Sequence, residues 1–199
     1  MKSLNDARLV TALSEEQRGV FSRADLQTAF ADRHSNSFAR RVRDLIQAGV
    51  LRRFLRGWYV AEAFDLATLS QRLATDSYIS FGNVLAGALL IGTRPERQVM
   101  AVKIGRKRIY RALGFEILHL TIAEHLSFGH GALDGVQFAD SEKAVLDVLY
   151  FHLRGQRFFF DPFSDIDFSR LDPKRLREYL VHYRNPKFIS FASNLLQLP

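Results

Sequence analysis

Hydrophobic positions in the first thirty residues follow the spacing of two short helices. Leucines and a valine three or four residues apart predict a helix over residues 5–13. A second helix is predicted to begin after Ser22, because Ser22 can accept the backbone amide of Asp25 while the Asp25 carboxylate accepts the amide of Ser22. This second helix is predicted to end near Phe30.

A third predicted helix begins at Asn36 or Ser37, ends before Gly49, and separates apolar from polar positions. At 100° per residue, its apolar side carries Phe38, Val42, Leu45 and Ile46. Its opposite side carries Asn36, Arg40, Arg43 and Gln47, and Arg41 flanks the apolar side. Arginine binds guanine, and asparagine or glutamine binds adenine, through paired hydrogen bonds in the DNA major groove. The polar row therefore predicts a DNA-reading helix, with a merely solvated charged face as the alternative.

The pattern then changes to two short β-rich segments, residues 50–55 and 58–60, joined by a turn at Arg56 and Gly57. Three short helices followed by a basic hairpin predict a winged helix-turn-helix domain over residues 1–62, whose hairpin brings arginines to DNA phosphates. Winged helices also dock proteins, so the fold alone does not decide the function. The residues predicted to bind DNA are Asn36, Ser37, Arg40, Arg41, Arg43, Gln47, Arg52, Arg53 and Arg56.

Residues 63–199 predict a second domain of small, mixed α/β type, so the whole chain is expected to belong to the α+β class. The predicted elements are helices over residues 64–74, 84–91, 140–151, from 172 onwards and 187–196, and strands over residues 98–104, 115–120 and 136–139. Asp65 is expected to cap the first of these helices. The order of the strands does not follow from the pattern.

Charge and composition narrow the classes of function. The chain carries 28 Lys and Arg against 21 Asp and Glu, and residues 1–60 alone hold 11 against 6. Such an asymmetry is typical of a basic recognition module joined to a near-neutral domain. The absence of cysteine excludes disulfides, thiolate metal sites and cysteine nucleophiles. No apolar run approaches the roughly 20 residues of a membrane span, and no signal-peptide core is visible, so we expect a cytoplasmic protein without a membrane partner.

Two segments of the second domain carry a resemblance to a known family. They are Tyr78-Ile79-Ser80, which leads into a small-residue helix, and the run Phe138-Ala139-Asp140-Ser141-Glu142-Lys143-Ala144-Val145-Leu146-Asp147. Together with the basic winged helix before them, they resemble the AbiEi antitoxins of abortive-infection, type IV toxin–antitoxin systems. The resemblance covers nearly the whole chain, although Asp140 stands where the family commonly has a small residue.

The resemblance implies a protein with two tasks and without catalytic residues, cofactor or metal. Its N-terminal domain would repress its own operon by binding inverted repeats in double-stranded operator DNA. Its C-terminal domain would oppose a nucleotidyltransferase-like toxin, without a stable complex being required.

One further basic cluster and one acidic cluster are candidate sites. Lys103, Arg106, Lys107, Arg108 and Arg111 form the densest positive run, which is either an antitoxin and anion-binding patch or a solubilising turn. Asp161, Asp165 and Asp167 could bind a metal, but their spacing matches no calcium loop, so a capped, solvated loop is favoured. Two rival functions remain: a winged-helix regulator whose second domain senses a ligand, and a DNA-tethered, metal-dependent nuclease or nucleotidyltransferase.

Overall fold

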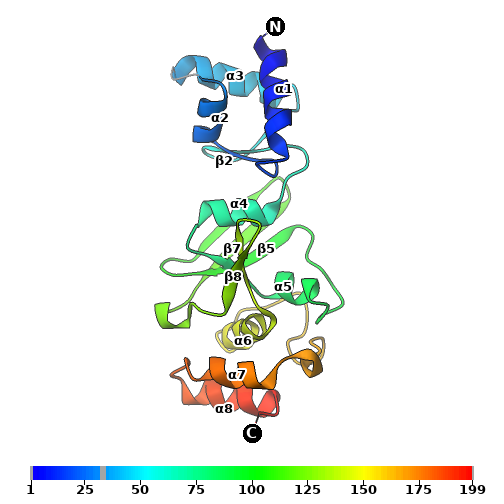
Figure 1. Ribbon diagram of the computed structural model, residues 1–199, viewed down its shortest axis with the longest axis vertical. Helices are drawn as coiled ribbons and strands as arrows, with labels where there is room; N and C mark the ends of the chain where they lie inside the picture. The colour runs from blue at the N-terminus through cyan, green and yellow to red at the C-terminus, as the bar shows by residue number, and fades with distance from the viewer. Residues whose placement is uncertain (1, 32–34, 199) are drawn as a thin grey trace. The chain divides into compact units, whose positions relative to one another are not determined.

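The computed structural model describes residues 2–31 and 35–198 of the chain. The chain forms two compact units, unit 1 over Met1–Leu69 and unit 2 over Ser70–Pro199. Helices and two β-sheets are both present, which confirms the predicted α+β character (Figure 1). Among the described residues, no helix is both long enough and apolar enough to cross a membrane.

Unit 1 combines three helices with a small antiparallel sheet. Its elements are α1 (Lys2–Ser14), β1 (Val20–Ser22), α2 (Arg23–Ala29), α3 (Ser35–Gln47), β2 (Arg52–Leu55) and β3 (Trp58–Val60). The strands lie in the order β1-β3-β2, with β3 in the centre. A basic hairpin, β2–β3, thus follows α3 directly and pairs with a strand that precedes α2.

Local signals position the helices of unit 1. The predicted capping box forms: the Ser22 hydroxyl accepts the Asp25 amide at 3.1 Å, and the Asp25 carboxylate accepts the Ser22 amide at 2.7 Å. The apolar faces of the three helices meet in one buried core. That core consists of Val10, Phe21, Leu26, Phe30, Phe38, Val42, Leu45 and Leu51.

Unit 2 is built on a six-stranded mixed sheet with the order β6-β7-β5-β4-β9-β8. Its strands are β4 (Tyr78–Ile79), β5 (Gln98–Lys103), β6 (Arg108–Ala112), β7 (Phe115–Thr121), β8 (His130–Leu133) and β9 (Val136–Ala139). Its helices are α5 (Gly82–Gly87), α6 (Ser141–His152), α7 (Pro173–Leu180) and α8 (Pro186–Leu195), and helix α4 (Leu66–Leu73) spans the boundary between the units. Strand pairs β5–β7 and β4–β9 are parallel, and the other pairs are antiparallel.

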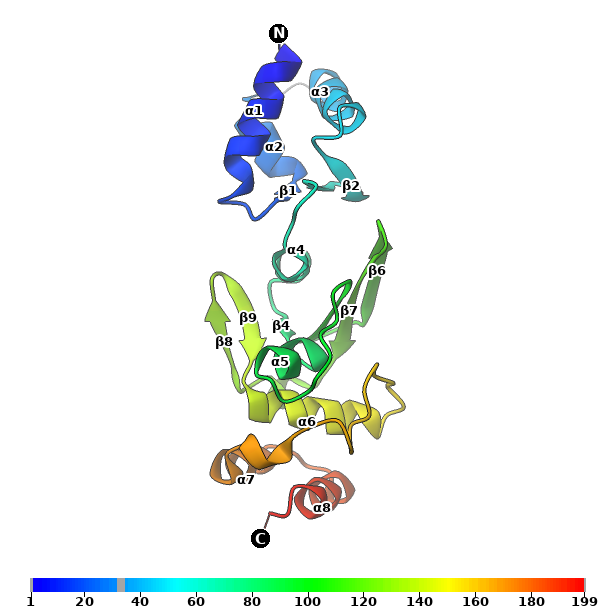
Figure 2. The same cartoon turned by 90° about the vertical axis from the view of Figure 1, so that its right-hand side faces the viewer.

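The core of unit 2 lies between one face of the sheet and helix α6. Figure 2 shows α6 along this face, with α7 and α8 packed on its far side. Ten consecutive residues of α6, from Glu142 to Phe151, are buried. An almost wholly buried helix needs apolar neighbours on every side, and α5, α7, α8 and the sheet provide them.

The structure corrects several predicted elements of unit 2. The helix expected over residues 84–91 is only α5, Gly82–Gly87, because Leu89 turns to a positive φ of 57°. Strands β6 and β8 were not predicted, and Arg108 and Arg111 lie on strand β6 rather than in a turn. Strand β8 begins at His130, directly after Gly129. Two residues of positive φ, Asp134 and Gly135, form the tight turn between β8 and β9.

Candidate nucleic-acid interface

Helix α3 presents opposite faces to the core and to solvent, as its sequence predicts. Phe38, Val42 and Leu45 are buried. The four residues of the predicted reading row are all exposed: Asn36, Arg40, Arg43 and Gln47. Ile46, expected on the apolar side, lies at its edge and is 36% exposed. The helix therefore offers solvent a polar row bordered by an apolar margin.

A groove of about 350 Å³ runs beside this row, between α3 and the hairpin strands. Three arginines from three different elements line it: Arg23 from the start of α2, Arg43 from α3 and Arg53 from β2. The remaining lining residues are Phe38, Ala39, Val42, Ile46, Gln47 and Tyr59. Three arginines among the lining residues make the groove positively charged, which favours an anionic ligand such as phosphate.

Two of the predicted DNA-binding arginines make intramolecular contacts. Arg41 forms a two-pronged ion pair with the buried carboxylate of Asp6, at 2.8 and 2.5 Å, and donates to the Phe30 carbonyl oxygen at 3.0 Å. Arg52 donates to the carbonyl oxygen of Glu62 at 2.9 Å. Arg41 thus ties α3 to α1, and Arg52 anchors the chain that leaves β3.

The other predicted arginines of unit 1 have their charges available to a partner. Arg40, Arg43, Arg53 and Arg56 are exposed, and no ion pair joins them to an acid within residues 2–31 and 35–198. The Ser37 side chain is half-buried, near the start of α3. An exposed cation loses little solvation by remaining unpaired, and it releases counterions when it meets a phosphate.

The predicted basic run of unit 2 is spread over the end of β5, the following turn and the edge strand β6. Lys103 forms an ion pair with Asp76 at 3.4 Å, and Arg111 pairs with Glu116 on the neighbouring strand. Arg106, Lys107 and Arg108 are exposed, and no ion pair is seen for them in the described part of the chain. The free charge of the run is therefore concentrated in these three residues.

The two segments that carry the family resemblance meet in the core of unit 2. Lys143 and Asp147, one turn apart on α6, form an ion pair at 2.5 Å with both side chains fully buried. The other Asp147 oxygen accepts hydrogen bonds from Tyr78 at 3.1 Å and from Ser80 at 2.8 Å. The Lys143 ammonium also lies 4.8 Å from the Phe128 ring centre. The polar residues of both segments thus form one buried network.

Burial is the largest influence on the pKa values of the acidic groups in this network. Burial raises the pKa of the Asp147 carboxyl above its ordinary value, while the charge of Lys143 and the hydrogen bonds oppose that rise. Burial, followed by the negative charge of Asp147, raises the pKa of the Tyr78 hydroxyl. The Tyr78 hydroxyl therefore stays protonated and donates. This arrangement supports the fold and offers solvent no reactive group.

Residues beside the network hold the neighbouring helices in place. Asp140 caps α6 by accepting the Lys143 amide at 2.8 Å, and Tyr179 donates its hydroxyl proton to the other Asp140 oxygen at 2.5 Å. The Glu142 carboxylate accepts the Asp172 amide at the start of α7, at 2.9 Å. Glu142 thus links the start of α6 to the start of α7.

The three aspartates considered as metal ligands organise a turn. Asp165 accepts the Asp161 amide at 2.7 Å, Asp161 accepts the Phe163 amide at 2.7 Å, and Asp167 accepts the Ser169 amide at 3.1 Å. No group of three or more His, Cys, Asp or Glu side chains able to hold a metal occurs among the described residues.

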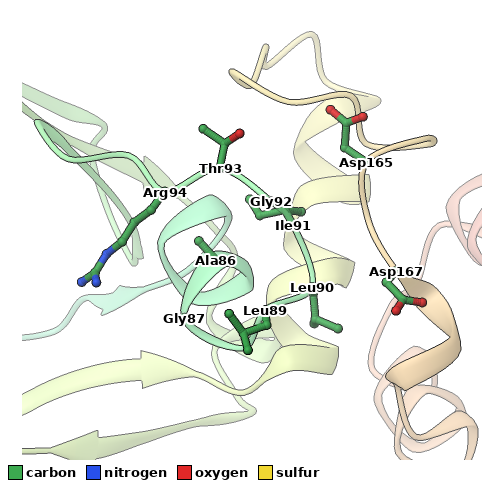
Figure 3. A pocket seen from close by; sticks show the side chains of 10 residues that line it. All are labelled: Ala86, Gly87, Leu89, Leu90, Ile91, Gly92, Thr93, Arg94, Asp165 and Asp167. Atoms are coloured by element: carbon green, nitrogen blue, oxygen red, sulfur yellow. The ribbon is translucent and has the colours of Figure 1, made fainter.

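Two of these aspartates border a cavity of unit 2. This pocket, of about 680 Å³, lies between the loop after α5 and the segment that carries Asp165 and Asp167. Figure 3 shows the two carboxylates on one side, while Arg94 extends away from them. Its size falls within the range of small-molecule sites. Its walls are otherwise formed by small or apolar residues of the α5 loop: Ala86, Gly87, Leu89, Leu90, Ile91, Gly92 and Thr93.

Sequence reasoning missed Arg23 and Tyr59 as residues of the groove, and it missed the partners of Asp147. Arg23 follows a capping box, and Tyr59 lies in a hairpin strand, so their local patterns report only secondary structure. A lysine and an aspartate four residues apart in an apolar helix are a visible sign of a buried pair. The hydroxyls that complete the network come from β4 and the segment after it, which only the fold brings near.

Comparisons with known proteins give a likeness in fold alone. No known family description matches the sequence, and no curated protein matches it either. Among solved structures, the chain is similar to the RV2827C protein from Mycobacterium tuberculosis, with a TM-score of 0.63 and 15% sequence identity. The match covers 96% of this chain and 75% of that protein.

Proposed function

We propose that this chain is a non-enzymatic DNA-binding repressor, with unit 1 as a winged helix-turn-helix domain. The observation that carries the proposal is the exposed polar row of α3 beside a groove that three arginines line. An α-helix fits the major groove, where exposed Arg, Asn and Gln side chains can distinguish bases. Arg53 and Arg56 of the hairpin would contact phosphates, which fix position without reading sequence.

Arginine replacements can separate base reading from phosphate binding in a gel-shift assay. With DNA from upstream of its own gene, Arg40→Ala or Arg43→Ala should cost about 1–3 kcal/mol of specific binding if each arginine reads a base. Affinity for a scrambled duplex should fall much less. Arg53→Ala and Arg56→Ala should weaken binding to both duplexes alike. Arg177→Ala, at an exposed position of unit 2, is the matched control and should change neither.

We do not expect Arg41 and Arg52 to contact DNA directly. Their guanidinium groups contact Asp6 and the Glu62 carbonyl respectively, so they shape the interface rather than supply its free charge. We expect Arg41→Ala to weaken DNA binding only in proportion to its effect on folding. A loss of DNA affinity in a fully folded Arg41→Ala protein would instead show that Arg41 contacts DNA directly.

The antitoxin task of unit 2 is proposed from the resemblance to AbiEi antitoxins and from the exposed charge of the basic run. Replacing Arg106, Lys107 and Arg108 together by Gln should leave repression intact and abolish protection against a neighbouring nucleotidyltransferase-like toxin. The control variant carries three Gln at the exposed positions of Lys174, Arg177 and Lys187, which removes the same charge elsewhere. Growth on toxin expression is the measurement, with the antitoxin under an independent promoter. Equal protection by both triple variants would show that the basic run is only a solubilising surface.

A ligand sensor is the second candidate function, favoured by the pocket beside Asp165 and Asp167. A bound ligand stabilises the folded chain by mass action, so a metabolite screen should reveal a raised melting temperature. Gly92 lines the pocket, and a Cβ atom added there meets no neighbour, so the large ring of a Gly92→Trp variant should occupy the pocket and abolish that shift. Sensing would further require that the same ligand alter DNA affinity.

A further inference from the structure

The six-stranded sheet of unit 2 has two edge strands, and only one of them is protected by charge. The edge strand β6 carries Arg108 and Arg111, and charged side chains on an edge oppose pairing with another chain. The other edge strand, β8, has the sequence His130-Gly131-Ala132-Leu133, without Lys, Arg, Asp, Glu or Pro. All four of its residues are exposed. Strand β8 thus lacks the charged side chains and the proline that commonly prevent strand addition.

The register of the β8–β9 hairpin shows which backbone groups point outward from this edge. The Gly129 carbonyl accepts the Asp140 amide at 2.9 Å, so these two residues form a hydrogen-bonded pair. Hydrogen-bonded and non-bonded pairs alternate in an antiparallel ladder. Gly131 and Leu133 therefore bond toward β9, and His130 and Ala132 direct their N–H and C=O groups outward. No other strand of the described residues pairs with β8.

Gly131 has no function within its own chain that requires a glycine. A Cβ atom built there meets nothing within 4 Å, and the residue lies outside the positive-φ region. Glycine inside a strand costs conformational entropy and gives no side chain to pack. A glycine in such a position often marks the close approach of another backbone.

We propose that β8 pairs with β8 of a second copy of this chain, antiparallel, across a twofold axis at Gly131. In this register His130 faces Ala132 of the second copy, and the outward backbone groups of both residues exchange four hydrogen bonds. Gly131 faces Gly131 of the second copy as a non-bonded pair, where Cα atoms lie only about 4.5 Å apart. Leu133, 65% exposed, faces Gly129 of the second copy and covers it.

A second copy is the occupant that this edge fits best. The pairing is self-complementary, as a twofold interface requires. The two residues whose backbone groups point outward, His130 and Ala132, face the same two residues of the second copy. Stacking of the His130 ring on Tyr78, with ring centres 4.6 Å apart, holds one end of β8 in place for pairing. The strand is short, so the association is expected to be weak and concentration-dependent. It goes beyond DNA binding and does not depend on it.

Single-cysteine variants test the register directly, because the natural chain contains no cysteine. Gly131→Cys places two thiols face to face at the axis, within the Cα separation of about 4.4–6.8 Å that disulfides need. Ala132→Cys is the matched control, since its two copies lie beyond about 7 Å in this register. Under the same mild oxidant, Gly131→Cys should form linked dimers at least tenfold faster. Equal rates, or no dimer from Gly131→Cys, would overturn the proposal.

Sedimentation of the intact chain gives a second readout without a thiol. Gly131→Lys brings two like charges together at the axis, while the open space around Gly131 leaves the fold intact, as circular dichroism can verify. The native chain should associate as its concentration rises, and Gly131→Lys should raise the dimer dissociation constant at least tenfold. Thr93→Lys adds the same charge at an exposed site away from β8 and should not. A native chain that stays monomeric, or a Gly131→Lys variant that associates equally well, contradicts the pairing.

Discussion

Replacing Asp147 by asparagine should destabilise unit 2 severely, because it leaves the Lys143 ammonium buried without a counter-charge. Both side chains of the pair are fully buried, and their atoms lie 2.5 Å apart. Breaking a buried pair on one side typically costs about 3–5 kcal/mol, whereas removing both charges is often nearly neutral. Since whole domains are stable by about 5–15 kcal/mol, this loss would consume much of the stability of unit 2.

The double variant Lys143→Met with Asp147→Asn separates charge from packing. Its asparagine oxygen can still accept hydrogen bonds from Tyr78 and Ser80, and no charge remains in the core. We expect it to recover most of the loss. With the Lys143→Met single variant completing the double-mutant cycle, the coupling free energy should exceed about 2 kcal/mol. Glu178→Gln, an exposed neutralisation on α7, should change the stability by less than about 0.5 kcal/mol.

Urea unfolding followed by circular dichroism measures these free energies. The single tryptophan, Trp58, lies in unit 1, so its fluorescence reports that unit separately. In the Asp147→Asn variant, the midpoint of unfolding followed by circular dichroism should move to a lower urea concentration. The midpoint followed by Trp58 fluorescence should move much less. An Asp147→Asn protein within about 1 kcal/mol of the native one would refute the argument that an unpaired buried ammonium is costly here.

Two further predictions concern other buried polar groups. Burial, followed by the charge of Lys103, lowers the pKa of His119 to about 4. The unfolded state therefore binds more protons between about pH 6.5 and 4, and the free energy of unfolding should fall by about 3 kcal/mol as the pH drops through this window. The His119→Gln variant should lose most of this dependence in urea titrations at several pH values. Arg41→Ala leaves the buried Asp6 carboxylate without its ion-pair partner and should destabilise unit 1 by about 2 kcal/mol, measured by Trp58 fluorescence. Adding Asp6→Asn should restore part of the lost stability.

The helices of unit 1 could be predicted because each carries its own local signals. The capping box of α2 and the separation of polar from apolar positions on α3 are properties of a few neighbouring residues. The role of Arg41 could not be predicted in this way, because its partner Asp6 lies 35 residues earlier. The angular position of Arg41 on the helix shows only that it lies beside the apolar side. The Asp6 carboxylate comes close to it only when α1 packs on α3.

The edge strands of unit 2 were missed for two physical reasons. Strand β6 carries two exposed arginines, Arg108 and Arg111, and a run of positive charge resembles a solvated turn as long as its pairing with β7 is unknown. Strand β8 contains glycine and alanine, which have low strand propensity. The Asp134-Gly135 pair between β8 and β9 is a strong hairpin signal, and it could have identified β8 from the sequence.

The salt dependence of DNA affinity tests most directly the central claim that unit 1 binds DNA through α3 and its hairpin. If about five phosphates are neutralised, the logarithm of the association constant should fall against the logarithm of salt concentration with a slope of about −4.5. Arg53→Ala should reduce the magnitude of this slope by about 1, because one phosphate contact is lost. The account predicts both results with DNA from upstream of the chain's own gene. A slope near zero for the native chain would contradict it and would indicate that unit 1 docks a protein instead.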